Sequence, residues 1–223
     1  MYTTITTLTA LAALLPTLSL AAPAASPDSA PSSSSGTAFQ VTPAQLIAIA
    51  PKSASCPANP KFPNECQTAA GAAAAINWGF TEYGITTPGE AAGLVATMAL
   101  ESGEFEFAIH HFPSPVPGQG TRNMQGPKFN VEYAQSLPAL KASLPAGNDP
   151  AAVLTLLVAN IDYDFASAAW FLTTQCSPSV RDGLKKGGLA GFTAYVGCIG
   201  APMADDRTAY YKAAAKAFGV SAS

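Results

Sequence analysis

The stretch "TPGEAAGLVATMALES" spans residues 87–102 and decides the class of fold. It opens with a capping box, in which Thr87 is the N-cap and Glu90 is the third helical residue. Small and apolar residues then continue to Glu101, and Gly103 can end the helix. The sequence therefore predicts an apolar helix that finishes on a carboxylate, where the negative end of the helix dipole disfavours a negative charge.

The position of Glu101 on this helix suggests a use for the carboxylate. Leu94, Met98 and Glu101 are spaced by four and three residues, so they share one face of the helix. If that face packs inward, Glu101 is partly desolvated, and burial together with the helix dipole is expected to raise its pKa. A carboxylic acid that keeps its proton near neutral pH can act as a general acid. We therefore predict Glu101 as a catalytic residue.

The remainder of the chain also favours helices. Residues 67–80 are rich in alanine, the best helix former. Asp149-Pro150 is a helix start, and a 3.6-residue apolar period from there to Leu172 predicts one long helix. Ser177-Pro178 starts another helix, and residues 205–218 form the last one, ended by Gly219. Alternating strand patterns are scarce, so the predicted fold class is mainly α.

A Pro- and Gly-rich segment, residues 108–130, lies between the Glu101 helix and the predicted long helix. Irregular segments of this length inside a compact domain are usually functional. We expect this loop to line a cleft beside Glu101. It contains His110 and His111, which point apart as neighbours and so cannot easily bind one metal ion.

The N-terminal residues have a different composition from the rest. Residues 1–21 contain no charged side chain and include an apolar run, which predicts a secretory signal peptide although the usual positive start is missing. Residues 22–38 are rich in Pro and Ser and predict a disordered linker. The folded domain is expected over 39–223, in a secreted, extracellular protein.

Four cysteines, at positions 56, 66, 176 and 198, fit an oxidising compartment. Four cysteines allow three pairings, of which Cys56–Cys66 and Cys176–Cys198 are favoured because near neighbours close small loops. The spacings are not those of a metal site and no histidine lies close in sequence, so neither a metal nor another cofactor is expected.

The overall composition restricts the partners. The chain is 48% hydrophobic and 11% charged, with a net charge of −3. It has no basic cluster, so nucleic acid is not an expected partner. After the leader, no apolar run is long enough to span a membrane. We expect a monomer that acts on no membrane.

Short motifs appear in the same order as in a known family, over about residues 88–212. They are Glu101-Ser102, Asn123-Met124-Gln125, the helical stretch 148–172, and "FTAYVGCIG" at 192–200. This set resembles soluble lytic transglycosylases and goose-type lysozymes, and looks closest to secreted fungal muramidases. The chain departs from the family in a longer gap before Gln125 and in Val196, where the family has asparagine.

The resemblance implies a lysozyme-like helical domain and a secreted glycoside hydrolase acting on peptidoglycan. Glu101 would be the general acid that cleaves a β-1,4 bond. The implied substrate-binding residues are Ser102, Asn123, Met124, Gln125 and Tyr195. Alternatives left open are a chitin- or chitosan-type hydrolase, a lytic transglycosylase, and a non-catalytic wall-binding or effector protein.

Two further assignments stay open at this point. A second catalytic carboxylate could be one of several acidic residues: Glu104, Glu106, Glu132, Asp162 or Asp164. Arg122 could pair with a carboxylate of the substrate or form a structural salt bridge.

Overall fold

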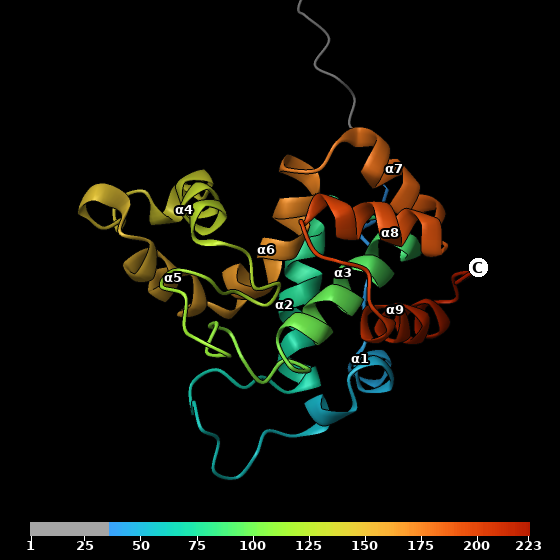
Figure 1. Ribbon diagram of the computed structural model, residues 1–223, viewed down its shortest axis with the longest axis horizontal. Helices are drawn as coiled ribbons and strands as arrows, with labels where there is room; N and C mark the ends of the chain where they lie inside the picture. Colours follow the sequence, from blue (N-terminus) through green and yellow to red (C-terminus); the bar gives the residue numbers. More distant parts are fainter. Residues whose placement is uncertain (1–35) are drawn as a thin grey trace, which may run out of the picture. The chain divides into compact units, whose positions relative to one another are not determined.

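A computed structural model describes residues 36–223 of the chain (Figure 1). The expected leader, 1–21, and most of the expected linker, 22–38, lie outside the described residues. Across the described range, extended backbone pairs only in two isolated bridges, Ile109 with Gly120 and Gly120 with Gln125. The prediction of a mainly α fold is confirmed.

The described residues form the following longer helices. In order they are α1 (Pro43–Ile49), α2 (Ala69–Glu82), α3 (Pro88–Glu101), α4 (Pro127–Ser136), α5 (Pro150–Val158), α6 (Ile161–Thr174), α7 (Pro178–Lys186), α8 (Leu189–Cys198) and α9 (Asp205–Phe218). Three 3₁₀ turns, Pro51–Ala54, Pro138–Leu140 and Ala146–Asn148, lie between them.

Helix α3 lies in the main core and is buried over most of its length. It packs against α9, α7 and α6, while α2 packs along α6. The α2–α6 crossing is close because Gly79 has no side chain: a Cβ there would lie 2.8 Å from the Cα of Ala166. A second apolar cluster lies where α4 and α5 meet the end of α6, and Figure 1 shows α4 and α5 together on one side of α6.

The local sequence signals account for most helix starts. Thr87 and Glu90 form the expected capping box, and α3 runs to Glu101 as predicted. The predictions for α2, α7 and α9 are also confirmed, with Gly219 in the left-handed conformation after α9.

The single long helix predicted from Pro150 to Leu172 is wrong. The chain forms two helices, α5 and α6, whose axes differ by 112°. The apolar period continues through the bend, but Asn160 caps a new helix there, since its side-chain oxygen accepts from the backbone N–H groups of Asp162 and Tyr163. A short polar side chain that satisfies these donors favours a helix start over continuation.

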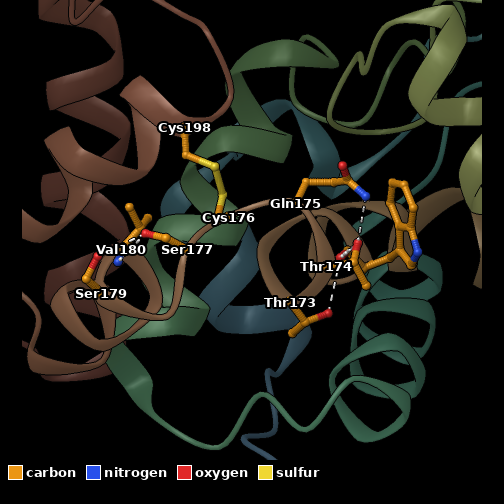
Figure 2. Close-up of a disulfide and its surroundings, with 9 residues drawn as sticks. Thr173, Thr174, Gln175, Cys176, Ser177, Ser179, Val180 and Cys198 are labelled. Atoms are coloured by element: carbon orange, nitrogen blue, oxygen red, sulfur yellow. Dashed lines mark hydrogen bonds between the residues drawn. A yellow bond between two sulfur atoms is a disulfide. The ribbon is translucent and has the colours of Figure 1, made fainter.

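The structure pairs Cys56 with Cys66 and Cys176 with Cys198, the pairings that the short spacings favour. Figure 2 shows the second disulfide, which ties the connection between α6 and α7 to the last residue of α8. Two disulfides are compatible with an extracellular protein. Within residues 36–223 no single helix is long and apolar enough to cross a membrane. The bent pair of α5 and α6, taken together, reaches the required length and apolar composition.

Candidate functional site

Glu101 is the last residue of α3, and the turn that follows fixes its position. Ser102 is fully buried; its hydroxyl donates to the carbonyl of Met98 (2.6 Å) and accepts from the N–H of Phe105 (2.9 Å). Both hydrogen-bonding roles of this hydroxyl are therefore used within the turn. Ser102 therefore holds the end of α3, and its assignment to substrate binding stays a prediction.

The carboxylate of Glu101 forms an ion pair with Arg207, the third residue of α9. The Glu101 side chain is 22% exposed and the Arg207 side chain 11% exposed. The prediction that Glu101 keeps its proton assumed an unpaired carboxylate, whereas the structure pairs it with the guanidinium of Arg207. Sequence reasoning missed Arg207, which lies 106 residues away along the chain.

Glu101 and Arg207 line one side of a cavity of about 460 Å³. Asn123, Met124 and Gln125 line the same cavity, so the structure brings these predicted residues together with Glu101. Their assignment to substrate binding stays a prediction.

The two amide side chains in this wall are held in place by other side chains. The Oδ1 atom of Asn123 accepts from the hydroxyls of Thr121 (2.9 Å) and Ser167 (2.8 Å), and its Nδ2 donates to Gln125 Oε1 (3.2 Å). Gln125 Nε2 in turn donates to Asn130 Oδ1 (2.7 Å). Side chains fixed in this way lose little entropy when a ligand binds.

The backbone of this wall depends on a close approach at Gly120, which bridges both Ile109 and Gln125. A Cβ at Gly120 would lie 2.6 Å from the carbonyl oxygen of Ala108 and 2.9 Å from the side chain of Leu154. Only glycine fits there without displacement. Residues 119 and 123–126 line this cavity, so part of the Pro- and Gly-rich loop lies beside Glu101 as expected.

The same cavity also has an apolar wall. It is formed by residues of α4, α6 and the segment after α8: Phe129, Phe171, Ile199, Ala201 and Pro202. The cavity lining therefore contains both hydrogen-bonding groups and hydrocarbon. Sites of this composition usually bind small organic molecules.

Two smaller cavities share lining residues with this one, directly or in turn, and the three are together called the groove. A second cavity of about 130 Å³ shares Glu101 and Met124 with the first and is lined further by Phe107, His110, His111 and Phe112. A third, of about 230 Å³, shares both histidines with the second. His111 is held by stacking on Phe62 (3.5 Å between ring centroids) and by Glu65 (2.7 Å).

Tyr195 is a fully buried residue of α8 and does not line the cavity. Burial raises the pKa of its hydroxyl above the ordinary value, and the Glu101 carboxylate raises it further, while the neighbouring Thr97 hydroxyl and Arg207 lower it. The structure therefore places Tyr195 near Glu101, as the resemblance implies, but as a neutral group of the core and not as an exposed binding residue.

Arg122 forms a structural salt bridge. Its Nε donates to Asp164 Oδ2 (2.7 Å), and its other nitrogens donate to the carbonyls of Phe105, Phe107 and Glu65. Burial raises the pKa of Asp164 to about 6, while the contact with Arg122 opposes that rise. The structural alternative left open by the sequence is the one observed.

None of the five acidic residues considered as a second carboxylate lines the cavities that contain Glu101, among residues 36–223. Glu104, for example, accepts from the N–H of Lys52 (2.7 Å) and the hydroxyl of Tyr210 (2.9 Å). The described range also contains no group of three His, Cys, Asp or Glu side chains placed to hold a metal ion.

Comparisons with known proteins give a different class of function from the one predicted. No family model and no solved structure matches the chain. Over 149 residues the chain is 38% identical to a Fusarium oxysporum protein named bifunctional dioxygenase (DOX)-epoxy alcohol synthase (EAS). This relative speaks against a glycosidase. The match covers 63% of this chain and 12% of the relative, so the chain spans a small part of the relative's length.

The relative corrects the functional prediction made from the sequence motifs. Its name describes oxygenation and epoxy alcohol formation, which are oxidoreductase- and isomerase-type reactions, and no hydrolysis of a glycosidic bond. The prediction of a glycoside hydrolase, with its peptidoglycan and chitin variants, is thereby contradicted. Short motifs of two or three residues are weak evidence for an activity, even in the correct order.

Proposed function

We propose that this chain is a ligand-binding module whose groove takes an elongated, oxygenated organic molecule of the epoxy alcohol class. An epoxy alcohol combines a hydrocarbon chain with a hydroxyl and an epoxide oxygen. The name of the relative supplies this chemical class. The activity of that much longer protein is not assigned to this chain.

One observation carries the proposal: the lining of the main cavity combines hydrogen-bonding side chains with hydrocarbon. The Glu101–Arg207 pair and the amide of Asn123 can exchange hydrogen bonds with hydroxyl and epoxide oxygens. Phe129 and Ile199 can cover hydrocarbon. A ligand with both kinds of surface satisfies both parts of the lining at once.

The continuation of the groove supports an elongated ligand over a compact one. Beyond Glu101 and Met124, the adjoining cavity has Phe107 and Phe112 in its lining, and Phe112 is half exposed. An aliphatic chain that leaves the main cavity would pass over these rings and bury apolar surface against them. Each buried CH₂ group contributes about 0.8 kcal/mol.

The proposal is tested by isothermal titration of the full chain, with both disulfides intact, against a long-chain epoxy alcohol. We expect saturable binding with one site per chain. Glu101→Gln keeps the size of the side chain but removes its charge, and should weaken the affinity about tenfold, because a hydrogen bond to a charged group contributes roughly 1.5–3 kcal/mol. Glu82→Gln, an exposed position on α2, is the matched control and should bind as the unchanged chain does.

An oligomer of N-acetylglucosamine serves as the competing probe in the same titration. If the sugar oligomer binds and the epoxy alcohol does not, the proposed ligand class is wrong. Equal affinities of the unchanged chain and Glu101→Gln for the epoxy alcohol would place its binding elsewhere.

We also propose a kinship with lysozyme-like domains at the level of fold, and secretion of the protein. A buried helix ending in Glu101, with residues 123–125 across the same cavity, supports the kinship. The disulfides and the apolar residues 1–21 support secretion. N-terminal sequencing of protein recovered from the culture medium of a secreting host tests the latter: intact residues 1–21 would contradict it.

A further inference from the structure

His111 is held in one orientation where it lines the two smaller cavities of the groove. Its Nε2 atom lies 2.7 Å from Glu65 Oε1, and one face of its ring stacks on Phe62 with 3.5 Å between the ring centroids. The side chains of His111 and Glu65 are 15% and 11% exposed. One ring nitrogen and one ring face are thus occupied by the protein.

The other ring nitrogen of His111, Nδ1, is available. It has no hydrogen-bond partner among residues 36–223. It is also not one of the buried polar atoms without a partner, whereas Nδ1 of the neighbouring His110 is one of them. Nδ1 of His111 is therefore open to solvent, on a side chain that lines two cavities.

Glu65 determines which ring nitrogen of His111 carries the proton. Its Oε2 atom accepts from the backbone N–H groups of Ala108 (2.8 Å) and Ile109 (3.1 Å), and its Oε1 atom is left for His111. An ionised carboxylate only accepts hydrogen bonds, so Nε2 of His111 must donate. In a neutral imidazole, a proton on Nε2 leaves a lone pair on Nδ1, which is then an acceptor.

We propose that Nδ1 of His111 binds a hydroxyl group of the ligand by accepting a hydrogen bond from it, and that Glu65 is the positioning residue that keeps Nδ1 an acceptor. This site rests on the proposed function and deepens it, because it assigns a position to the hydroxyl group of an epoxy alcohol. Epoxide and ether oxygens cannot donate, so neither can form this hydrogen bond.

The surroundings of His111 fit a hydroxyl group on a hydrocarbon chain. The ring centroids of Phe107 and Phe112 lie 6.2 and 6.1 Å from that of the imidazole, and both rings line the same cavity. That cavity shares Glu101 with the main cavity. The carboxylate of Glu101 is the other strong acceptor in the lining, but it is already paired with Arg207.

The test is Glu65→Gln, which reverses the hydrogen bond to His111. The backbone N–H groups of Ala108 and Ile109 need an acceptor, so the new amide turns its oxygen towards them and its NH₂ group towards His111. Nε2 must then accept, and the proton moves to Nδ1. An alcohol can accept as well as donate, whereas a methyl ether only accepts, so the variant should no longer prefer the alcohol.

The probes are a long-chain epoxy alcohol and its O-methyl ether, titrated calorimetrically at about pH 8, where a histidine is ordinarily neutral. The unchanged chain should bind the alcohol about fivefold more tightly than the ether, because only the alcohol donates to Nδ1. In Glu65→Gln this preference should disappear. An ether that stays weaker in both proteins is excluded by size alone, and this result contradicts the proposal.

A second variant, His111→Phe, keeps a ring beside Phe62 but has no nitrogen. It should also bind the alcohol no better than the ether. The position of the proton is measured directly by the nitrogen chemical shifts of the imidazole, since the chain contains two histidines and the signals lost in His111→Phe belong to His111. We expect the proton on Nε2 in the unchanged chain and on Nδ1 in Glu65→Gln. A proton on Nδ1 in the unchanged chain would overturn the proposal.

Glu90→Gln is the matched control for Glu65→Gln. The Glu90 carboxylate is also buried, accepts from a backbone N–H (Thr87, 3.2 Å) and pairs with a basic side chain (Arg181, 2.7 Å), but it lines none of the three cavities. This variant should lose stability and keep the preference for the alcohol. Glu82→Gln, exposed on α2, takes its place if the buried change prevents folding.

A simpler pair of probes, n-octanol and methyl octyl ether, separates failure of the site from failure of the proposed function. If this pair shows the preference and Glu65→Gln removes it, while the epoxy alcohol does not bind, the site stands and the proposed function is wrong. If the epoxy alcohol binds and Glu65→Gln still prefers it to its ether, the hydroxyl lies at another acceptor, so the site is wrong and the proposed function stands. If neither alcohol binds, both proposals are overturned.

Discussion

Two arginine–carboxylate pairs, Arg122–Asp164 and Arg207–Glu101, differ in how completely the hydrogen bonds of the guanidinium are used. In the buried pair, both side chains are 2% exposed, and all three guanidinium nitrogens of Arg122 donate to protein oxygens. In the cleft pair, Glu101 is 22% exposed and one nitrogen of Arg207 has no partner among the described residues. The guanidinium of Arg122 is thus fully used, although Asp164 Oδ1 has no partner among the described residues, whereas the guanidinium of Arg207 has capacity left for a ligand.

The comparison shows how chemically similar pairs can serve different purposes. Arg122 joins the turn after α3, the disulfide loop and α6, through Phe105, Glu65 and Asp164. A guanidinium that donates from every nitrogen fixes the backbone segments that it joins. The Glu101–Arg207 pair joins only the end of α3 to the start of α9 and faces the main cavity. We expect stability to depend on the first pair and binding on the second.

The largest expected effect comes from breaking the buried pair. Arg122→Met leaves Asp164 as an uncompensated buried group and removes the donors to three backbone carbonyls. We expect a loss of about 3–5 kcal/mol in the free energy of unfolding, measured by urea denaturation followed by far-UV circular dichroism. A loss of less than about 1 kcal/mol in the free energy of unfolding would mean that the fold does not depend on the buried pair.

The pH dependence of stability should also report on the buried pair. The pKa of Asp164 is raised from 3.8 to about 6, so between these values the folded state keeps a proton that the unfolded state has lost. The contribution of Asp164 to stability therefore falls as the pH rises through this window, by about 3 kcal/mol in total.

The measurement is the free energy of unfolding of the unchanged chain and of Asp164→Asn, at several values between pH 4 and pH 7. The difference between the two should change with pH in that window, whatever the absolute stability of the variant. Parallel pH profiles for the two proteins would contradict the assignment to Asp164.

A change at Gly120 tests the cleft wall without touching either pair. Gly120→Ala places a Cβ 2.6 Å from the carbonyl oxygen of Ala108, and we expect a loss of about 1–3 kcal/mol from the forced backbone shift. Because Gly120 bridges to Gln125, ligand affinity should fall as well.

Gly197→Ala in α8 is the matched control for this change. A Cβ there meets no atom within 4 Å, so we expect no loss of stability, or a gain of up to about 1 kcal/mol from helix propensity. Thermal unfolding of both variants compares the two sites directly. Equal stability of Gly120→Ala and Gly197→Ala would show that the close approach at Gly120 is relaxed in solution.

The smallest effect on stability is expected from breaking the cleft pair. Arg207→Met removes the partner of a carboxylate that water can still reach, and we expect a loss of about 1 kcal/mol or less by urea denaturation. The same variant should abolish measurable binding of the epoxy alcohol. Equal losses in the free energy of unfolding for Arg207→Met and Arg122→Met would contradict the assignment of stability to the buried pair and of binding to the cleft pair.

Most helix limits could be predicted because the signals for them are local. Thr87 and Glu90 mark the start of α3, and Gly219 marks the end of α9. The break at Asn160 was missed because the apolar period continues through it, and a capping asparagine looks the same in sequence as one inside a helix. Helix α4 was missed because its start at Pro127 lies inside a segment rich in loop-forming residues.

The candidate site could be predicted only in part. Glu101 stands out because a carboxylate at the end of an apolar helix conflicts with the helix dipole. Arg207, which resolves that conflict, lies on α9, and no local pattern links the two. The pair of Glu65 and His111 likewise becomes visible only when the two loops that carry them are packed together. The chemical class of the ligand follows from neither residue.

The disulfide between Cys176 and Cys198 has a consequence for when the protein becomes competent to bind. It ties the chain just after Phe171 to the chain just before Ile199, and both residues belong to the apolar wall of the cleft (Figure 2). A newly made chain holds this wall together only by packing until the two thiols are oxidised. The cleft would then acquire its final shape during maturation, and protein purified in the presence of a thiol reductant would be an immature form.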